Sequence, residues 1–243
     1  MIRGVLFDMG ETLVTSLEKG DIHQIILKEK KIEKTAEEVA AAIVRAETSF
    51  GVRHSKTKLM ALDLKSFYEE LNSEVFKELD LKNHKALGKY AHKRWFDIAG
   101  LRMYDDVMPV LRRLSASGIR LGLVTNGYYE EARDVMERVY RTYVKGRLKA
   151  VGLPESMFSV IVGRDTVGAE KPDPRPFLHA AGALGLKPDE IIFVGDRYDK
   201  DYVGSQAVGM KPVLILRGRK LPAGVPQDIT KIQTLDELVD LIR

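Results

Sequence analysis

The stretch Val5-Leu6-Phe7-Asp8-Met9-Gly10-Glu11-Thr12-Leu13 decides how the rest of the chain is interpreted. Three apolar residues end at Asp8, and a glycine follows two residues later. This pattern is typical of a buried strand that opens into a turn. We therefore expect Asp8 to lie at the carboxyl end of a strand in the protein core.

After residue 101 the pattern becomes an alternation of apolar strands and helices. Asp106 is expected to cap a helix that reaches about Ser115, and Ser117-Gly118 to stop it. Such alternation predicts a parallel sheet covered by helices on both faces, which is an α/β, Rossmann-like fold. The expected strands are 119–124, 158–162, 191–194 and 212–216, and the expected helices are 128–151, 174–184, 203–208 and 235–242.

The segment 16–101 differs from its surroundings because it shows no convincing strand. Thr35 and Glu38 have the spacing of a capping box. Helical periodicity follows over 36–50, 59–79 and 84–98, which predicts a small helical bundle. We therefore expect an α/β core formed by residues 1–15 and 102–243, with an inserted α-helical domain at 16–101.

The composition excludes several classes of protein. The 243 residues contain no cysteine, which excludes disulfides, thiolate metal sites and a cysteine nucleophile. A formal charge of +4 is too small for a nucleic-acid-binding footprint. The N-terminus is too short and too soon charged for a signal peptide, and no apolar run approaches the roughly 20 residues that span a bilayer. We expect a cytoplasmic protein without a membrane or nucleic-acid partner.

Polar residues directly follow three of the predicted strands, namely Asp8, Thr125 and Asp196. In open parallel sheets, ligands bind at the carboxyl ends of the strands. This placement predicts a functional site that contains these three residues.

Four motifs occur in order along the chain: Asp8–Leu13, Thr125-Asn126-Gly127, Glu170–Pro174, and Gly195-Asp196 with Asp201. Together they resemble the haloacid dehalogenase superfamily, and the resemblance covers the whole chain. Most characterised members are phosphatases. The resemblance implies a hydrolase that acts on a small phosphorylated substrate, and it implies that the helical insertion at 16–101 is a cap domain.

The resemblance also implies a role for each motif residue. Asp8 would attack phosphorus and form an aspartyl-phosphate. Mg²⁺ would be held by Asp8, Asp196 and the backbone carbonyl of Gly10. The Thr125 hydroxyl and the Asn126 backbone N–H would bind the phosphate, and Lys171 would stabilise its charge. Asp201 and Thr12 would orient these groups without touching the substrate.

One position departs from the family pattern. Phosphatases of this superfamily usually carry a second aspartate two residues after the nucleophile, as general acid and base, but this chain has Gly10. Such catalysis is typically worth about 10²- to 10⁴-fold. The enzyme could be slow or select good leaving groups, Glu11 could substitute, or the proton could come from metal-bound water or from His23 or His54 in the cap.

Other readings stay open. A 2-haloacid dehalogenase would need no metal, and the Gly195-Asp196 pair disfavours it because adjacent carboxylates repel each other without a cation. A phosphonatase would need a buried cap lysine that forms a Schiff base. A regulatory protein that binds phosphate would have the fold of a phosphatase whose catalytic site is degraded. The candidate cap lysines are Lys28, Lys56, Lys58 and Lys65, and Arg53 or Lys56 could meet a second anionic group on the substrate. The sequence indicates neither the physiological substrate nor the oligomeric state.

Overall fold

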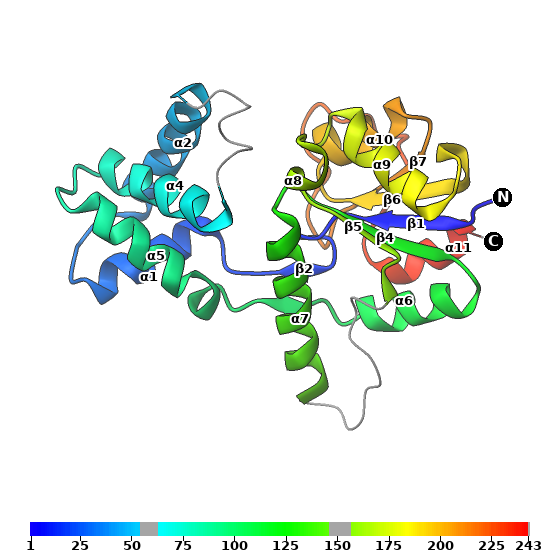
Figure 1. Ribbon diagram of the computed structural model, residues 1–243, viewed down its shortest axis with the longest axis horizontal. Helices are drawn as coiled ribbons and strands as arrows, with labels where there is room; N and C mark the ends of the chain where they lie inside the picture. The colour runs from blue at the N-terminus through cyan, green and yellow to red at the C-terminus, as the bar shows by residue number, and fades with distance from the viewer. Residues whose placement is uncertain (54–62, 146–156, 243) are drawn as a thin grey trace. The chain divides into compact units, whose positions relative to one another are not determined.

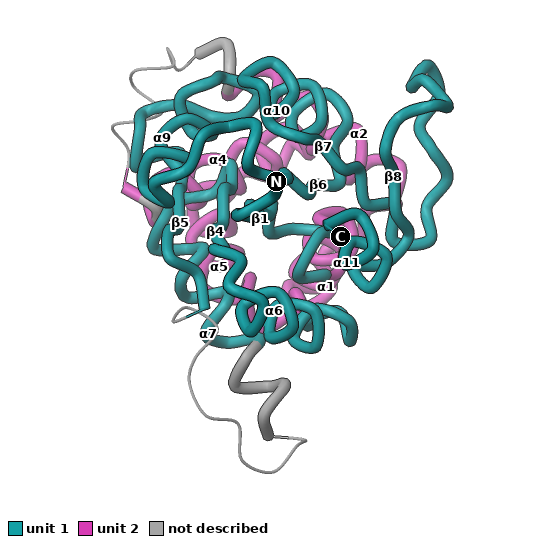
Figure 2. The backbone as a smooth tube through the Cα atoms, turned by 90° about the vertical axis from the view of Figure 1, so that its right-hand side faces the viewer, with its two compact units in different colours: residues 1–15, 102–243 teal, residues 16–101 magenta. Residues whose placement is uncertain are grey.

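The computed structural model describes residues 1–53, 63–145 and 157–242. The chain divides into two compact units, which Figure 2 distinguishes by colour. Unit 1 contains residues 1–15 and 102–243, and unit 2 contains residues 16–101.

Unit 1 is built on a six-stranded sheet in which every pairing is parallel. The strand order is β5-β4-β1-β6-β7-β8, so the first strand of the chain lies near the middle. This arrangement confirms the predicted α/β, Rossmann-like core. The strands are β1 (Gly4–Phe7), β4 (Arg120–Val124), β5 (Val160–Val162), β6 (Ile191–Gly195), β7 (Lys211–Ile215) and β8 (Lys231–Ile232), of which β8 was not predicted.

Helices flank the sheet on both sides, with α9 and α10 on one side and α6 and α11 on the other (Figure 1). Both faces are therefore buried, which explains why β1 and β6 are buried along their whole length. The predicted helix 128–151 is α7, whose described part ends at Lys145. The helices are α6 (Val107–Ala116), α7 (Tyr129–Lys145), α8 (Arg164–Val167), α9 (Pro174–Leu184), α10 (Val203–Ala207) and α11 (Leu238–Ile242).

The core of unit 1 anchors the strands that carry the motif residues. Leu6 of β1, Phe193 of β6 and Phe177 of α9 are at most 1% exposed and belong to one apolar cluster. Phe177 meets Phe193 edge-on, with ring centroids 4.9 Å apart. Burying side chains of this size stabilises the fold by roughly 1.5–3 kcal/mol each. The strand ends beyond these side chains are therefore rigidly placed.

Unit 2 is all helical among its described residues. The predicted capping box is present, since Thr35 and Glu38 exchange hydrogen bonds of 2.7 and 3.2 Å between side chain and backbone. The first helix of this unit was not predicted. The helices are α1 (Lys19–Glu29), α2 (Ala36–Arg53), α4 (Leu64–Glu78) and α5 (His84–Ile98), and their shared core includes Ile26, Val39, Ala42, Phe76 and Leu87.

The prediction for Asp106 was wrong in one respect. Asp106 does precede α6, but its side chain makes no capping hydrogen bond. Its carboxylate instead accepts bonds from Arg217 Nη1 at 2.5 Å and from the backbone N–H of Leu235 at 2.7 Å. A charge-assisted bond to a guanidinium is stronger than a cap, so the distant partner prevails.

A short antiparallel pair of strands lies where the chain leaves unit 1 at residue 15 and returns to it at residue 102. It consists of β2 (Val14–Thr15) and β3 (Arg102–Met103). The pair was not predicted, because two-residue strands leave no pattern in the sequence.

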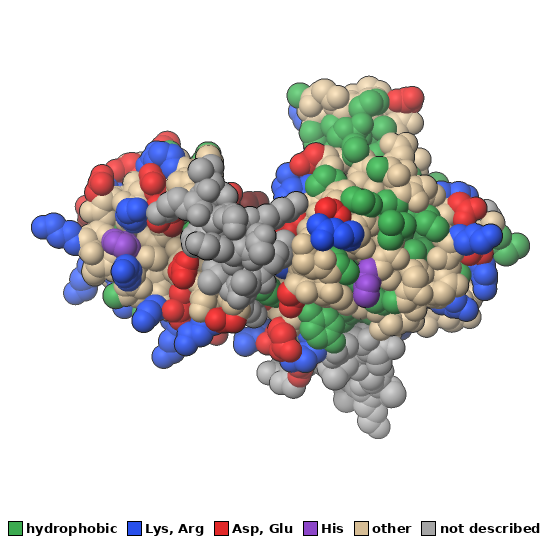
Figure 3. Space-filling view, turned by 45° about the horizontal axis from the view of Figure 1, so that its top comes forward, with side chains coloured by type: hydrophobic (Ala, Val, Ile, Leu, Met, Phe, Trp, Pro, Cys, Tyr) green, Lys and Arg blue, Asp and Glu red, His purple; other side chains and the backbone are tan. Residues whose placement is uncertain are grey.

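Two further observations concern the described helices and one face of the surface. Within the ranges given above, none of the helices combines the length and apolar character that crossing a bilayer requires. On the face drawn in Figure 3, acidic and basic side chains are interspersed, and the described residues there form no single basic patch.

Candidate active site

The register of the sheet brings the motif residues together. Phe7 of β1 pairs with Leu123 of β4 on one side and with Val194 of β6 on the other. The residues that follow these strands therefore emerge side by side at the carboxyl edge. They are Asp8 after β1, Thr125 after β4, and Asp196 after β6.

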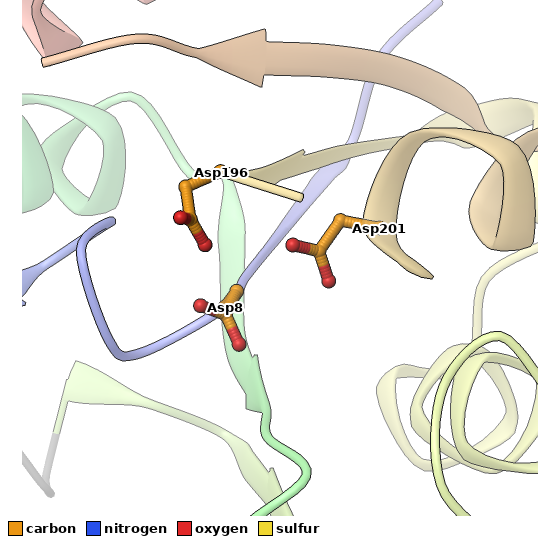
Figure 4. Close-up of side chains that lie close together, drawn as sticks. All are labelled: Asp8, Asp196 and Asp201. Atoms are coloured by element: carbon orange, nitrogen blue, oxygen red, sulfur yellow. The ribbon is translucent and has the colours of Figure 1, made fainter. Parts of the chain in front are cut away.

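Three carboxylates converge at this edge. Asp8, Asp196 and Asp201 each offer an oxygen, and these oxygens lie within 4.8 Å of one another. Figure 4 shows Asp196 and Asp201 facing Asp8 from the end of β6 and from a π-helical turn over Tyr198–Tyr202. So close a group of like charges needs cations nearby.

Lys171 supplies one of these cations. Its ammonium is buried and lies 2.6 Å from Asp8 Oδ1 and 2.7 Å from Asp201 Oδ1. Burial by itself would lower the pKa of Lys171, but the charges of Asp201 and Asp8 outweigh it and raise that pKa. Lys171 is therefore a permanent cation between two acidic groups.

The pKa of Asp8 is raised, first by burial and then by the charges of Asp201 and Asp196, while Lys171 opposes the rise. The pKa of Asp196 is raised for similar reasons, burial first and Asp201 second. Arg219 opposes that rise, because its Nη2 lies 3.0 Å from Asp196 Oδ2. Lys171 and the half-exposed Arg219 thus face three carboxylates, so the acidic groups outnumber these two cations.

Position 195, the first of the Gly195-Asp196 pair, has no room for a side chain. A Cβ at position 195 would collide with the carboxyl group of Asp201. The Asp201 side chain is held there by the backbone N–H of Arg197, which donates to Oδ2 at 2.9 Å. Glycine at 195 therefore lets Asp201 reach Lys171 while Asp196 faces Asp8.

The motif Thr125-Asn126-Gly127 forms the opposite side of the site. Thr125 is buried, and its Oγ1 accepts a bond from the Gly127 N–H at 3.1 Å. The Asn126 side chain exchanges two bonds with the backbone of Lys171, of 2.8 and 3.1 Å. Asn126 therefore positions the lysine loop, a role that sequence reasoning had not assigned to its side chain.

Three further residues of the first motif, Gly10, Glu11 and Thr12, differ in burial and in hydrogen bonding. Thr12 is fully buried and donates from Oγ1 to Asp8 Oδ2 at 3.4 Å. Gly10 is exposed. The Glu11 carboxylate accepts bonds from Tyr104 Oη at 2.8 Å and from Thr15 Oγ1 at 3.1 Å. To act as acid or base at Asp8, Glu11 would have to break both bonds.

The remaining candidates belong to unit 2, which spans residues 16–101. His23 is 2% exposed and lies in the core of unit 2 against the rings of Phe76 and Trp95. Lys28 and Lys65 are exposed, which is not the buried setting that a Schiff-base lysine needs. His54, Lys56, Lys58 and the side chain of Arg53 lie outside the described residues.

Sequence reasoning missed Arg217 and Arg219. Both lie in the loop that begins after β7 ends at Ile215, and the predicted strand 212–216 already placed them at the carboxyl edge. The rule that drew attention to Asp8 and Asp196 applies to them equally.

Comparison with known proteins identifies the family. The family model of haloacid dehalogenase-like hydrolases matches residues 2–209. The chain belongs to this family. Its order of motifs agrees with this membership, and it is accordingly a hydrolase.

Individual relatives are similar over nearly the whole chain. A glyceraldehyde 3-phosphate phosphatase of Methanopyrus kandleri is 31% identical, over 90% of this chain and 86% of the relative. A phosphoglycolate phosphatase of Aquifex aeolicus is 27% identical, over 98% and 97%. Among solved structures, a phosphatase of the same family from Thermococcus onnurineus is 26% identical to this chain, with a TM-score of 0.59. The match covers 99% of this chain and 98% of the Thermococcus chain.

Proposed function

We propose that this hydrolase is a Mg²⁺-dependent phosphatase that cleaves a small phosphate monoester through an aspartyl-phosphate on Asp8. The observation that carries the proposal is the convergence of Asp8, Asp196 and Lys171 at the carboxyl edge of the sheet. An anionic nucleophile that attacks an anionic ester needs positive charge nearby. Lys171 supplies one positive charge, and a Mg²⁺ ion held by Asp8 and Asp196 would supply another.

The acidic cluster fits a magnesium ion. Mg²⁺ prefers oxygen ligands and keeps several waters, and the oxygens of Asp8 and Asp196 face each other. Asp201 is more deeply buried than Asp8 and Asp196, and its oxygens face Lys171 and the Arg197 N–H. Asp8, Asp196 and the Gly10 carbonyl would therefore hold the ion. The bound ion would neutralise negative charge on the phosphoryl oxygens and keep Asp8 ionised.

The remaining groups would bind and orient the phosphate. Lys171 is fixed by Asp201 and Asn126, so its charge is already in place when substrate arrives. The Thr125 hydroxyl and the Asn126 N–H would donate to phosphoryl oxygens. Preorganised donors of this kind stabilise charge that develops in the transition state without reorganisation.

Gly10 would shape the choice of substrate. Without a second aspartate, no side chain at position 10 protonates the leaving group. Good leaving groups, such as aryl or acyl phosphates, lose little from this absence. The relatives named above act on glyceraldehyde 3-phosphate and phosphoglycolate, so small phosphorylated aldehydes and acids are the first metabolites to test.

Unit 2 would serve as a cap in this proposal. It is inserted between the first and second motifs and forms a separate compact unit with its own apolar core. Closure of such a unit would exclude water and bring specificity residues to the substrate.

The decisive experiment compares the unchanged protein with Asp8→Asn on p-nitrophenyl phosphate, glyceraldehyde 3-phosphate and phosphoglycolate, with Mg²⁺ and with EDTA. We expect Mg²⁺-dependent phosphate release that falls by at least about 10³-fold in Asp8→Asn, because the nucleophile is lost. Asp228→Asn, an exposed aspartate of the same unit, is the matched control. Metal-independent chloride release from a 2-haloacid would instead establish the dehalogenase alternative.

A further inference from the structure

A buried arginine that belongs to none of the four motifs lies behind the nucleophile loop. Arg217 follows β7, and its side chain is 5% exposed. Its Nε and Nη2 both donate to the backbone carbonyl of Thr12, at 3.2 and 2.5 Å. Its Nη1 donates to Asp106 Oδ2 at 2.5 Å. The guanidinium therefore joins three parts of unit 1 that are far apart in the sequence.

The surroundings of Arg217 are built to hold it. The Tyr104 ring lies 4.0 Å from the guanidinium carbon, and the Tyr104 hydroxyl donates to Glu11. Asp106, the other partner, also accepts the Leu235 N–H at 2.7 Å. A planar guanidinium with a ring against it and two anchored acceptors is fixed in both position and orientation.

The backbone carries strain at both ends of this network. Glu11 has φ of +51° and Arg217 has φ of +53°, a left-handed conformation that side chains rarely adopt. Such residues persist only where the surrounding structure determines them, and they gather at functional sites. Here the side chains of both residues meet Tyr104, so one network holds both strained positions.

We propose that Arg217 is a positioning residue for Asp8, acting through Thr12. Lys171 holds Asp8 Oδ1, and the Thr12 hydroxyl holds Asp8 Oδ2 at 3.4 Å. Arg217 holds the Thr12 carbonyl, so it sets where that hydroxyl lies. The inference rests on the proposed role of Asp8 as nucleophile, because in-line attack demands an oriented carboxylate.

The test is a double-mutant cycle of Arg217→Gln and Thr12→Val, with kcat and KM for p-nitrophenyl phosphate and the melting temperature of each variant. A misplacement of about 1 Å can cost about 100-fold in rate. We expect each single variant to lose at least about tenfold in kcat per folded molecule, with KM within about twofold. The double variant should be no slower than the slower single one, because both substitutions break one chain of contacts.

The matched control is Arg113→Gln. It removes an exposed arginine–aspartate pair of the same unit, Arg113 with Asp236, and should leave kcat unchanged. If Arg217→Gln does not fold, Arg217→Lys replaces it in the cycle. Lysine keeps a charge for Asp106 but cannot reproduce the fork on Thr12, so the same loss of kcat is expected.

Three outcomes would overturn the inference. They are an unchanged kcat in the Arg217 variant, losses in kcat that merely match the loss of folded protein, and additive losses in the cycle. Failure of the proposed function has a different signature, because the unchanged protein would then release no phosphate with Mg²⁺, or Asp8→Asn would release it equally fast.

Discussion

At the scale of single residues, Gly10 is the position that most affects the proposed chemistry. A Cβ built on Gly10 would meet no atom within 4 Å, and Gly10 is not among the residues with positive φ. A side chain is therefore sterically acceptable there. Neither crowding nor backbone strain requires a glycine at this position.

Gly10→Asp should therefore fold and should gain a general acid and base. We expect kcat for alkyl phosphates such as phosphoglycolate to rise, by up to about 10²-fold, while p-nitrophenyl phosphate gains little because its leaving group needs no proton. Steady-state kinetics on both substrates measure the difference. Gly10→Ala is the control for the added Cβ alone. Equal or lower rates in Gly10→Asp would mean that another group already supplies the proton.

At the scale of secondary-structure elements, α1 carries a histidine whose environment makes it sensitive to pH. His23 is buried, and its Nδ1–H donates a hydrogen bond of 2.7 Å to the Lys19 carbonyl. Burial lowers the pKa of His23 below its usual value of about 6.5. The folded protein therefore binds this proton less readily than the unfolded chain does.

Unit 2 should for this reason lose stability in mild acid. Below about pH 6.5 the unfolded state takes up a proton at His23 that the folded state resists, so the free energy of unfolding falls as the pH falls, until the lower folded pKa is reached. Thermal unfolding between pH 7.5 and 5 measures this loss. His23→Gln should show a smaller loss, whereas His179→Gln, an exposed histidine of unit 1, should behave like the unchanged protein. Parallel curves for all three proteins would contradict the prediction.

At the scale of the whole molecule, the proposed binding of Mg²⁺ to the acidic cluster would stabilise the folded protein. A ligand that binds only the folded state adds about 2.7 kcal/mol at 100 times its Kd. Arg219 is 47% exposed and pairs with Asp196, so it competes for the carboxylate that the proposed Mg²⁺ would use. An exposed pair of this kind is worth about 0.2–1 kcal/mol.

Magnesium should accordingly raise the melting temperature of the unchanged protein, and EDTA should reverse the rise. We expect no rise in Asp196→Asn, because a metal ligand is lost. In Arg219→Gln the Kd for Mg²⁺ measured by calorimetry should fall by about two- to fivefold, since the competing cation is gone. Lys231→Gln, an exposed lysine of the same unit, serves as the control. A weaker Mg²⁺ affinity in Arg219→Gln would show that Arg219 supports the ion instead of competing with it.

The sequence by itself determined most elements and the layout of the core. The apolar runs before Asp8, Thr125 and Asp196 predicted three strands, because a strand buried on both faces must be apolar throughout. The polar residues that follow these runs predicted the site at the carboxyl ends of the strands. Local signals of this kind act over a few residues and can be read without a structure. The capping box at Thr35 and the stop of α9 at Gly185, which has φ of +61°, belong to the same class.

Only the tertiary structure decided which polar groups meet. It showed that Asp106 binds Arg217 instead of capping α6, that Glu11 is engaged by Tyr104, and that the Asn126 side chain holds the Lys171 loop. These partners are 45 to 111 residues apart in the chain. A side-chain pairing over such a distance depends on how strands and helices pack, and no periodicity or local propensity encodes it.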